Sequence, residues 1–435
     1  MLSKAENERL TRVGRGTPMG ELMRRYWHPI AAAVQLDGEP TKRVRLLGED
    51  LVLYRDKSNN LGLIDESCPH RKVNMLYGIP EEEGLRCPYH GWLFNQEGQC
   101  TDQPYEQAED PGSNFKDKVR IRAYPVQELN GLIFAYLGPA PAPLLPRWDL
   151  FVWDNVLRDI GMAVIPCNWM QCQENSLDPV HVEWLHGRFS NYVLERMGRS
   201  DLKRVFWENG EQTDRTWGHE KIGFDVFEHG ILKRRIVHGE SEESPNWRIG
   251  HPAVFPNMLR VGSGFQYRVP IDDHNTLHVY YTVHIMPEGQ AVPKQEKIPF
   301  YEVPVPLPDG EGRLDWTLMD NNGGQDMWAW YSQGAIADRS TEALGLSDKG
   351  IILFRRLLKE QLAKMEAGDD PMNVFRDPAN NQCITLPWEG QEQAGRWIVE
   401  AMTTRRTGQA TKYSPVLREM VARERGEEAL KEPVY

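Results

Sequence analysis

Two short pairs of cysteine and histidine constrain this 435-residue chain more than any other feature of its sequence. Cys68 and His70 form a C-x-H pair. After sixteen further residues, Cys87 and His90 form a C-x-x-H pair. Two thiolates and two imidazoles on separate loops can bind one metal centre. This asymmetric spacing favours a [2Fe–2S] cluster with the cysteines on one iron and the histidines on the other. The alternative, a structural zinc site, is more typical of C-x2–4-C paired with H-x3–5-H.

A second group of candidate ligands follows the pattern D-x-x-H-x-x-x-x-H, with Asp178, His181 and His186. Five residues span about 140° around an ideal helix, so a regular helix would not direct both imidazoles to one point. We therefore expect a distorted helix, with Pro179, a helix stop at Gly187 or local π-type widening as the cause. Non-haem Fe(II) oxygenases bind their iron with two histidines and one carboxylate, which leave neighbouring coordination positions of the metal open.

Together these motifs resemble those of the Rieske non-haem iron oxygenases, the terminal α components of ring-hydroxylating and O-demethylating systems. The nearest resemblance is to the phthalate dioxygenase-like branch, and it extends to residues 16–29, 249–256 and 337–340. Rieske proteins that only carry electrons usually have an additional cysteine in each ligand loop, where this chain has Arg71 and Tyr89. The oxygenase type is therefore favoured over an electron carrier without oxygenase activity. The resemblance implies two cofactors, a [2Fe–2S] Rieske cluster and a mononuclear Fe(II).

In this family the carboxylate ligand of the mononuclear iron comes late in the chain. The resemblance assigns this role to Asp326, within residues 325–330, and makes His181 and His186 the other two ligands. Asp320 and Asp338 are the alternatives to Asp326. Asp338 precedes Arg339, a position that favours a structural ion pair or a cap.

Asp178 lies three residues before His181, so both side chains can lie on one face of a helix. In the family, the matching aspartate joins a histidine of the mononuclear site to a cluster histidine of the neighbouring subunit. For this chain the resemblance implies that Asp178 joins His181 to His70 or His90 of a neighbour, in a homotrimer or a stacked hexamer. The alternative is a helix N-cap. Four more polar residues are expected near the site: Asn168, Gln171, Glu174 and Asn175.

The resemblance implies oxidation of an aromatic carboxylic acid with O2. O-demethylation of a methoxylated, lignin-derived biaryl acid of the dehydrodivanillate type is favoured over cis-dihydroxylation of a phthalate- or benzoate-type acid. No G-x-G-x-x-G motif follows a predicted strand, so electrons are expected from a separate reductase, a ferredoxin or both. A substrate carboxylate needs a cation, for which four residues are candidates: Lys233, Arg234, Arg235 and Arg248.

The composition excludes several classes of partner. A formal net charge of −12 argues against a nucleic-acid partner, because phosphate binding needs a basic surface. No run approaches 18 apolar residues and the first residues lack the apolar segment of a signal peptide, so no membrane association is expected. The six cysteines do not form a disulfide framework. We expect a cytoplasmic protein.

The order of apolar runs and turn residues predicts an α+β fold with four parts. Residues 1–28 are a helical lead-in with a break at 14–18, and residues 29–146 are a small antiparallel β domain that carries the Rieske cluster. Residues 147–394 are a larger catalytic domain with an antiparallel sheet and helices, and residues 395–435 are a helical extension. Within these parts we predict strands at 43–47, 51–54, 61–64, 131–137, 205–207, 224–227 and 277–285, a helix at 350–367 and an extended Pro-rich linker at 139–146.

Overall fold

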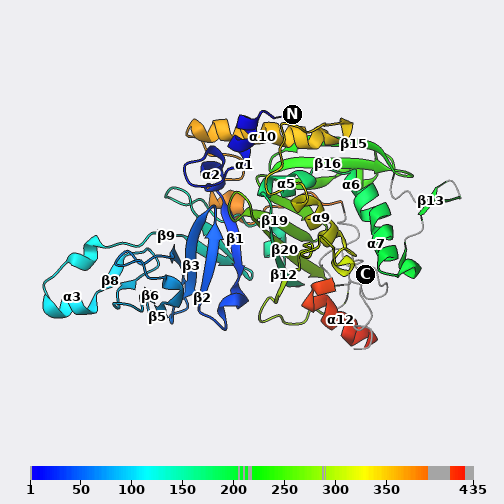
Figure 1. The fold of residues 1–435 in the computed structure, drawn as a ribbon. Helices are drawn as coiled ribbons and strands as arrows, with labels where there is room; N and C mark the ends of the chain where they lie inside the picture. The colour runs from blue at the N-terminus through cyan, green and yellow to red at the C-terminus, as the bar shows by residue number, and fades with distance from the viewer. Residues whose placement is uncertain are drawn as a thin grey trace.

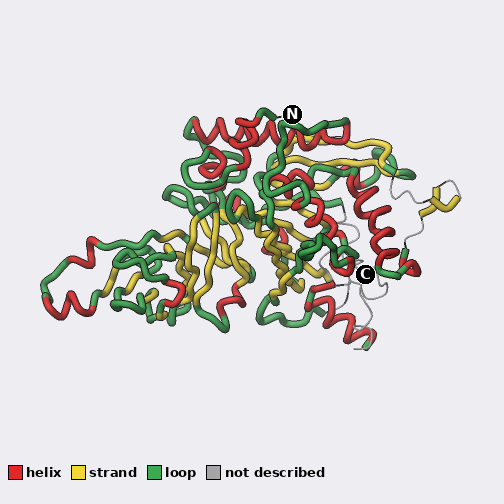
Figure 2. Tube along the Cα trace, in the orientation of Figure 1, coloured by secondary structure: helices red, strands yellow, loops and turns green. Residues whose placement is uncertain are grey.

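The computed structural model describes residues 2–203, 206–208, 211–213, 218–286, 289, 291–389 and 412–426. Two parts lie side by side (Figure 1). One contains short strands and lies at one end of the molecule. The other contains a sheet of long strands with helices packed around it (Figure 2). The expected α+β class, with a small antiparallel part and a larger part of sheet and helices, is confirmed.

Two short helices precede the first strand. Helix α1 (Lys4–Thr11) begins at Ser3, which forms a reciprocal capping box with Glu6. Helix α2 (Pro18–Met23) begins after Thr17 and has proline in its first turn. The predicted helical lead-in and its break are therefore confirmed. The apolar residues of both helices belong to the main hydrophobic core.

The short strands form three antiparallel sheets, with the strand orders β2-β3-β4-β9, β5-β6-β7-β8 and β1-β11-β10. The loops that contain the two cysteine–histidine pairs connect strands of these sheets. A separate small core that includes Tyr54, Met75 and Phe94 supports the loops. The predicted strands at 43–47, 51–54, 61–64 and 131–137 are confirmed to within two residues. The strands are β1 (Trp27–Ala32), β2 (Thr41–Leu46), β3 (Glu49–Arg55), β4 (Leu61–Asp65), β5 (Ile79–Pro80), β6 (Leu85–Arg86), β7 (Leu93–Phe94), β8 (Cys100–Asp102), β9 (Ala123–Tyr124), β10 (Val126–Leu129) and β11 (Leu132–Tyr136).

The large sheet has eight strands in the order β15-β16-β17-β18-β19-β20-β12-β21. Its pairs are antiparallel except β12 with β21, which run parallel. This differs from the expected antiparallel sheet. After β20 the chain crosses β12, and β21 pairs with the far side of β12. Because β21 runs antiparallel to β20, it runs parallel to β12. The strands are β12 (Val156–Ile165), β15 (His219–Phe227), β16 (Gly230–Val237), β17 (His251–Val254), β18 (Met258–Val261), β19 (Gly264–Pro270), β20 (Thr276–Ile285) and β21 (Phe300–Glu302), and a separate hairpin has β13 (Phe206–Glu208) and β14 (Glu211–Thr213).

Helices cover the large sheet. Helix α5 (Trp169–Asn175) contacts β19, and α10 (Lys349–Glu366) lies along β15 and β16 (Figure 1). The predicted helix at 350–367 is α10. Of the predicted extension at 395–435, the described residues contain α12 (Pro415–Arg425), whereas 395–411 and 427–435 lie outside them. Within the described part of the chain, no helix is long and apolar enough to cross a membrane.

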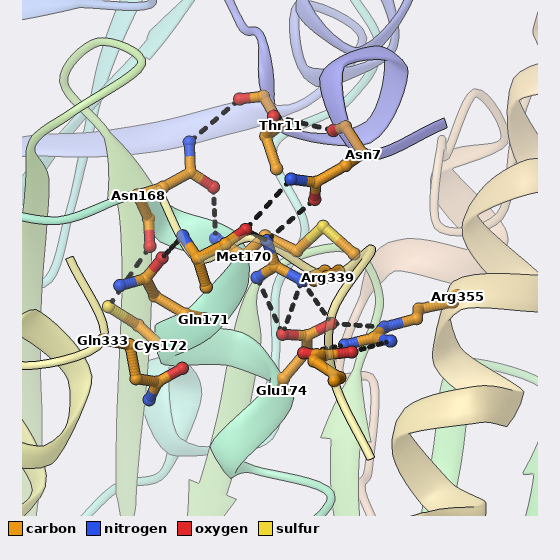
Figure 3. A network of polar contacts seen from close by, with 12 residues as sticks. Asn7, Thr11, Asn168, Met170, Gln171, Cys172, Glu174, Gln333, Arg339 and Arg355 are labelled. Atoms are coloured by element: carbon orange, nitrogen blue, oxygen red, sulfur yellow. Dashed lines mark hydrogen bonds and ion pairs between the residues drawn. The ribbon is translucent and has the colours of Figure 1, made fainter. Parts of the chain in front are cut away.

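A buried ionic network joins three of these segments (Figure 3). Glu174, at the end of α5, accepts hydrogen bonds from Arg339 and Arg355, each at 2.7 Å in its shortest contact. Arg355, on α10, also contacts both carboxylate oxygens of Glu342. Burial alone would raise the pKa of Glu174, but the charges and hydrogen bonds of Arg339 and Arg355 outweigh it and lower that pKa. Glu174 therefore links α5 to α10 and to the segment after α9.

This network corrects the expectation that Glu174 is a group of the metal site. Its two oxygens are both used by the two arginines. Gln171 is likewise structural, since its side chain donates to the carbonyls of Trp330 and Gly334 and accepts from the Ala337 amide. Asn168 caps α5, and Asn175 accepts from the Asp178 amide through its backbone.

The ionic network generates a stability prediction. Arg339→Met should leave the buried carboxylate of Glu174 with one of its two cations, and breaking a buried pair costs about 3 kcal/mol or more. We expect the melting temperature of the holoprotein, measured by circular dichroism, to fall by roughly 5 °C. Asp338→Asn is the matched control, because this neighbour is exposed and only caps Ser340. An unchanged melting temperature for Arg339→Met would contradict the stabilising role.

Candidate metal centres

The first cysteine–histidine pair lies in the loop after β4, and the second lies between β6 and β7. Both cysteines are buried, and each accepts a backbone hydrogen bond from the residue four positions later. Lys72 donates to the Cys68 carbonyl at 2.9 Å, and Gly91 donates to the Cys87 carbonyl at 3.1 Å. Gly91 has φ +75°, a left-handed conformation that favours glycine. These tight turns direct both thiols inward.

The two histidines lie together at the surface of the same region. The ring centroids of His70 and His90 are 4.4 Å apart, and His70 stacks on Trp92 at 4.3 Å. The thiols of Cys68 and Cys87 contact each other, so like ligands are grouped in pairs. Burial and the neighbouring Cys87 raise the pKa of Cys68, and a bound metal would favour its thiolate. A cluster with thiolates on one iron and imidazoles on the other fits this arrangement.

The second centre depends on a change of helix type. Helix α6 (His181–Glu183) continues into a π-helix, η4 (Trp184–Phe189), and then into α7 (Ser190–Arg196). A π-helix has i→i+5 hydrogen bonds, so side chains five residues apart lie on the same side. The imidazoles of His181 and His186 accordingly approach to 5.1 Å between ring centroids. The expected π-type widening is confirmed, whereas the expected stop at Gly187 is wrong, because the helical path continues through it.

Asp326 reaches the two histidines from α9 (Asn322–Tyr331), a helix 140 residues later in the chain. Asn321 caps this helix and accepts a hydrogen bond from the Gly324 amide. A side chain at Gly324 would clash, because its Cβ would lie 1.9 Å from the Leu318 carbonyl oxygen. This close approach fixes the first turn of α9, from which Asp326 projects toward His186.

The atoms of this centre are arranged as metal ligands. Asp326 Oδ1 lies 3.1 Å from His186 Nε2 and 3.7 Å from His181 Nε2, and one ligand atom from each residue lies within 4.8 Å of the others. Burial would raise the pKa of Asp326, but His186, His181 and Arg268 outweigh it and lower that pKa. The carboxylate is therefore ionised, and a buried anion between two imidazoles fits a divalent cation.

Gln325 settles the tautomer of His186 and was missed from the sequence. Its Oε1 lies 2.9 Å from His186 Nδ1, and its Nε2 donates to the Met319 carbonyl at 2.8 Å. Because an amide oxygen only accepts, Nδ1 must donate, and in the neutral imidazole Nε2 is then the acceptor that faces Asp326. Orienting partners of this kind are usual for metal-binding histidines. The only sequence signal was its position next to Asp326.

Asp178 has the helix-cap role considered from the sequence, and its second oxygen faces His181. Its Oδ1 accepts from the backbone amides of Val180 at 2.9 Å and His181 at 3.3 Å, as a helix cap does. Its Oδ2 lies 3.5 Å from His181 Nδ1, the imidazole nitrogen directed away from Asp326. Burial would raise the pKa of Asp178, but His181 and these amides lower it overall. The carboxylate is placed to orient His181.

The other carboxylates considered as ligands have different partners. Asp320 forms an ion pair with Lys412 at 2.7 Å. Asp338 is exposed and accepts hydrogen bonds from the amide and hydroxyl of Ser340, so it is a cap. Within the described part of the chain, the group of three side chains that could hold a metal ion is His181, His186 and Asp326.

Two family models match the chain. One, described as "Rieske [2Fe-2S] domain", matches residues 26–125, and another, described as "LigXa C-terminal domain like", matches residues 311–385. The chain is 46% identical over 387 residues to the 5,5'-dehydrodivanillate O-demethylase oxygenase subunit of Sphingobium sp. (strain NBRC 103272 / SYK-6), covering 89% of this chain and 87% of that relative.

A more distant relative and a solved structure are also named as oxygenase components. Identity is 34% over 407 residues to the phthalate 4,5-dioxygenase oxygenase subunit of Pseudomonas putida, covering 86% of this chain and 89% of that protein. The fold is also similar to the solved terminal oxygenase of carbazole 1,9a-dioxygenase from Novosphingobium sp. KA1. That match has a TM-score of 0.51 and 20% identity, and it covers 82% of this chain and 98% of the other.

The geometry of the second centre predicts the result of removing its carboxylate. Asp326→Ala should lower the mononuclear metal content at least tenfold, because the site loses its one anionic ligand. The absorbance of the iron–sulfur cluster should not change, because the loops with the cysteine–histidine pairs connect strands of the small sheets and not of the large sheet. Asp320→Ala is the matched control and should retain the metal. Metal analysis that found normal content in Asp326→Ala and loss in Asp320→Ala would reverse the assignment.

Proposed function

The chain belongs to the Rieske non-haem iron oxygenases, and from this premise we propose that it O-demethylates a methoxylated aromatic acid of the 5,5'-dehydrodivanillate type. Its cofactors are those of the family, a Rieske [2Fe–2S] cluster and a mononuclear iron. The observation that supports the substrate class is 46% identity to a dehydrodivanillate O-demethylase over 89% of the chain, against 34% to a phthalate dioxygenase. Cis-dihydroxylation of a phthalate-type acid is the alternative.

The proposal includes which residues hold each cofactor. The paired thiols and paired imidazoles suit the two irons of the cluster, and the buried carboxylate between two imidazoles suits mononuclear Fe(II). An electron carrier without oxygenase activity would not need this second centre. The proposed cluster ligands are Cys68, His70, Cys87 and His90, and the proposed ligands of the mononuclear iron are His181, His186 and Asp326.

The reaction converts an aryl methyl ether, O2, two electrons and two protons into a phenol, formaldehyde and water. When bound, the mononuclear iron supplies the site of O2 activation, and the cluster supplies an electron. The side chains prepare this site: Gln325 holds the tautomer of His186, and Asp178 holds the ring of His181. Asp326, which is buried, contributes the negative charge of the site.

We also propose that the enzyme works as a ring of at least three subunits, a homotrimer or stacked hexamer. In one chain, strands β5 to β8 beside the cluster loops lie at the opposite end of the molecule from α6 (Figure 1). The cluster that reduces the mononuclear site would therefore belong to a neighbour, with Asp178 joining His181 to the partner subunit's His70 or His90. Electrons would enter from a reductase, a ferredoxin or both.

Turnover distinguishes the proposed reaction from its alternative. The purified oxygenase, supplied with electrons by a compatible reductase, should release formaldehyde from 5,5'-dehydrodivanillate in proportion to the O2 consumed. The demethylated phenol should appear in the same amount. Phthalate should yield little product in the same assay. A cis-diol from phthalate, with no formaldehyde from the methoxylated acid, would favour ring dihydroxylation instead.

The bridging role of Asp178 predicts a kinetic defect without a structural one. Asp178→Asn keeps an oxygen that can cap the helix but loses the negative charge that would attract the imidazole N–H groups of His181 and of the partner subunit. We expect both metals to be retained and cluster reoxidation, followed in a single turnover with substrate and O2, to slow at least tenfold. The same rate as in the wild-type enzyme would leave Asp178 as a cap only.

A further inference from the structure

Strand β16 places two cations on the helix-covered face of the large sheet. Side chains alternate along a strand, so Lys233 and Arg235 share one face. In the register of β15 and β16, Phe224 lies opposite Lys233. Helix α10 packs against Phe224 so closely that a Cβ at Gly350 would lie 2.3 Å from the Phe224 ring. His251 of β17 is also opposite Lys233 in the register. Lys233 therefore has Phe224 and His251 as neighbours beneath the helices.

Arg234 lies on the other face and already has partners. Its guanidinium forms an ion pair with Asp225 at 2.6 Å and donates to the carbonyl of Arg248 at 2.7 Å. Arg248 itself is exposed. Of the four cations considered from the sequence, only Lys233 and Arg235 are thus placed toward the interior.

Lys233 is buried and Arg235 is partly buried, and neither has a hydrogen-bond acceptor or ion-pair partner among the described residues. Lys233 is 7% exposed, and no described residue forms a hydrogen bond or ion pair with its ammonium. The Nε of Arg235 is also buried without a hydrogen bond. Burial lowers the pKa of Lys233 to about 8 and also lowers that of Arg235. A buried charge without a partner is unfavourable, so this face is suited to receive an anion.

The position of Lys233 connects this face with the candidate iron site. The charges of Asp178 and Asp326 act on its ammonium, together with those of Arg235 and Glu389. An anion held by Lys233 would therefore lie near the reacting centre. A cation near the metal site can hold one end of a substrate while the other end reaches the metal.

Charged groups of both signs surround the two cations. Glu389 Oε1 lies 3.1 Å from His251 Nε2, and burial raises the pKa of Glu389 while it lowers that of His251 well below its usual range. His251 is therefore neutral. The carboxylates that act on the two cations are Glu389, Glu240, Asp178 and Asp326, and none of them forms an ion pair with Lys233 or Arg235 in the described part of the chain. Arg260, the other cation that acts on Glu389, is neutralised by Asp149 at 2.5 Å.

We propose that Lys233 and Arg235 bind the carboxylate of the aromatic substrate, and that this pair makes the enzyme select acids over neutral arenes. A carboxylate offers two oxygens to the ammonium and to the guanidinium, and such charge-assisted hydrogen bonds are stronger than neutral ones. The inference rests on the proposed function in taking the substrate to be an aromatic acid, but it does not depend on which bond is oxidised.

The test compares acids with their uncharged esters. Binding of 5,5'-dehydrodivanillate and of phthalate, each with its methyl esters, is measured by calorimetry on the anaerobic holoenzyme. Lys233→Met should weaken acid binding roughly 10- to 100-fold and change ester binding less than about twofold. Arg234→Met, which removes the same charge from the opposite face, should change neither by more than about twofold. Lys233→Arg should restore most of the acid affinity.

The pH dependence gives a second readout. Lys233 is charged below its pKa of about 8, so the affinity of the wild-type enzyme for the acid should fall as the pH rises through that value. Arg235 stays charged and His251 neutral in this range, and ionisation of Glu389 also disfavours the acid. Asp178 and Asp326, whose pKa values are lowered, stay ionised and do not contribute to the change. Lys233→Arg should keep its affinity to higher pH, because the guanidinium does not titrate there.

Several outcomes would overturn the inference. These are equal weakening of acids and esters, loss of the mononuclear metal in Lys233→Met, or no saturable binding of either acid to the wild-type enzyme. Loss of the metal would mean that Lys233 supports the metal site itself. Acid binding that depends on Lys233, combined with a cis-diol product, would support the subsite and contradict only the proposed demethylation.

Discussion

His186 Nε2 and Asp326 Oδ1 face each other 3.1 Å apart in the interior, and much of the catalytic part is organised around this contact. Such a contact needs a positive charge between the two atoms, either a proton on Nε2 or a metal ion. The hydrogen bond from His186 Nδ1 to Gln325 fixes the ring so that a neutral imidazole directs the Nε2 lone pair to this point. Because His181 Nε2 also faces Asp326, a metal ion can replace the proton and bind all three side chains.

Bringing these ligands together requires rigid supports from distant parts of the chain. The π-helical segment turns His186 toward His181, and the close approach at Gly324 fixes the start of α9. The ion pairs of Glu174 with Arg339 and Arg355 join α5, which leads into the first histidine, to the segment after α9 and to α10. These buried charges are satisfied by one another, so they fix geometry without leaving an unpaired ion.

The sequence predicted the parts of the site that have short-range spacing. The cysteine–histidine pairs and the two histidines of the second centre lie within short segments, and the misfit of five residues with a regular helix indicated the π distortion. Asp326 could be chosen only by resemblance, because nothing local distinguishes it from Asp320, whose carboxylate pairs with Lys412. The expectation that Glu174 belongs to the metal site was wrong. Its partners, Arg339 and Arg355, lie over 160 residues later in the chain, and no local sequence pattern indicates contacts of that kind.

The same limit applies to the choice among the basic residues of β16. Lys233, Arg234 and Arg235 are consecutive and look alike in sequence, but strand alternation gives them opposite surroundings. Arg234 is neutralised by Asp225, whereas Lys233 and Arg235 lie under the helices on the side of the metal site. Asp178 and Glu389 offset part of the charge that the two cations add near the metal site, but neither forms an ion pair with Lys233 or Arg235 in the described part of the chain. A carboxylate that contacts both cations directly would form charge-assisted hydrogen bonds with them, and a neutral ring would not. Selection of an acid thus depends on the charge of a sheet face, whereas the bond that is oxidised depends on which carbon the bound ring holds at the metal.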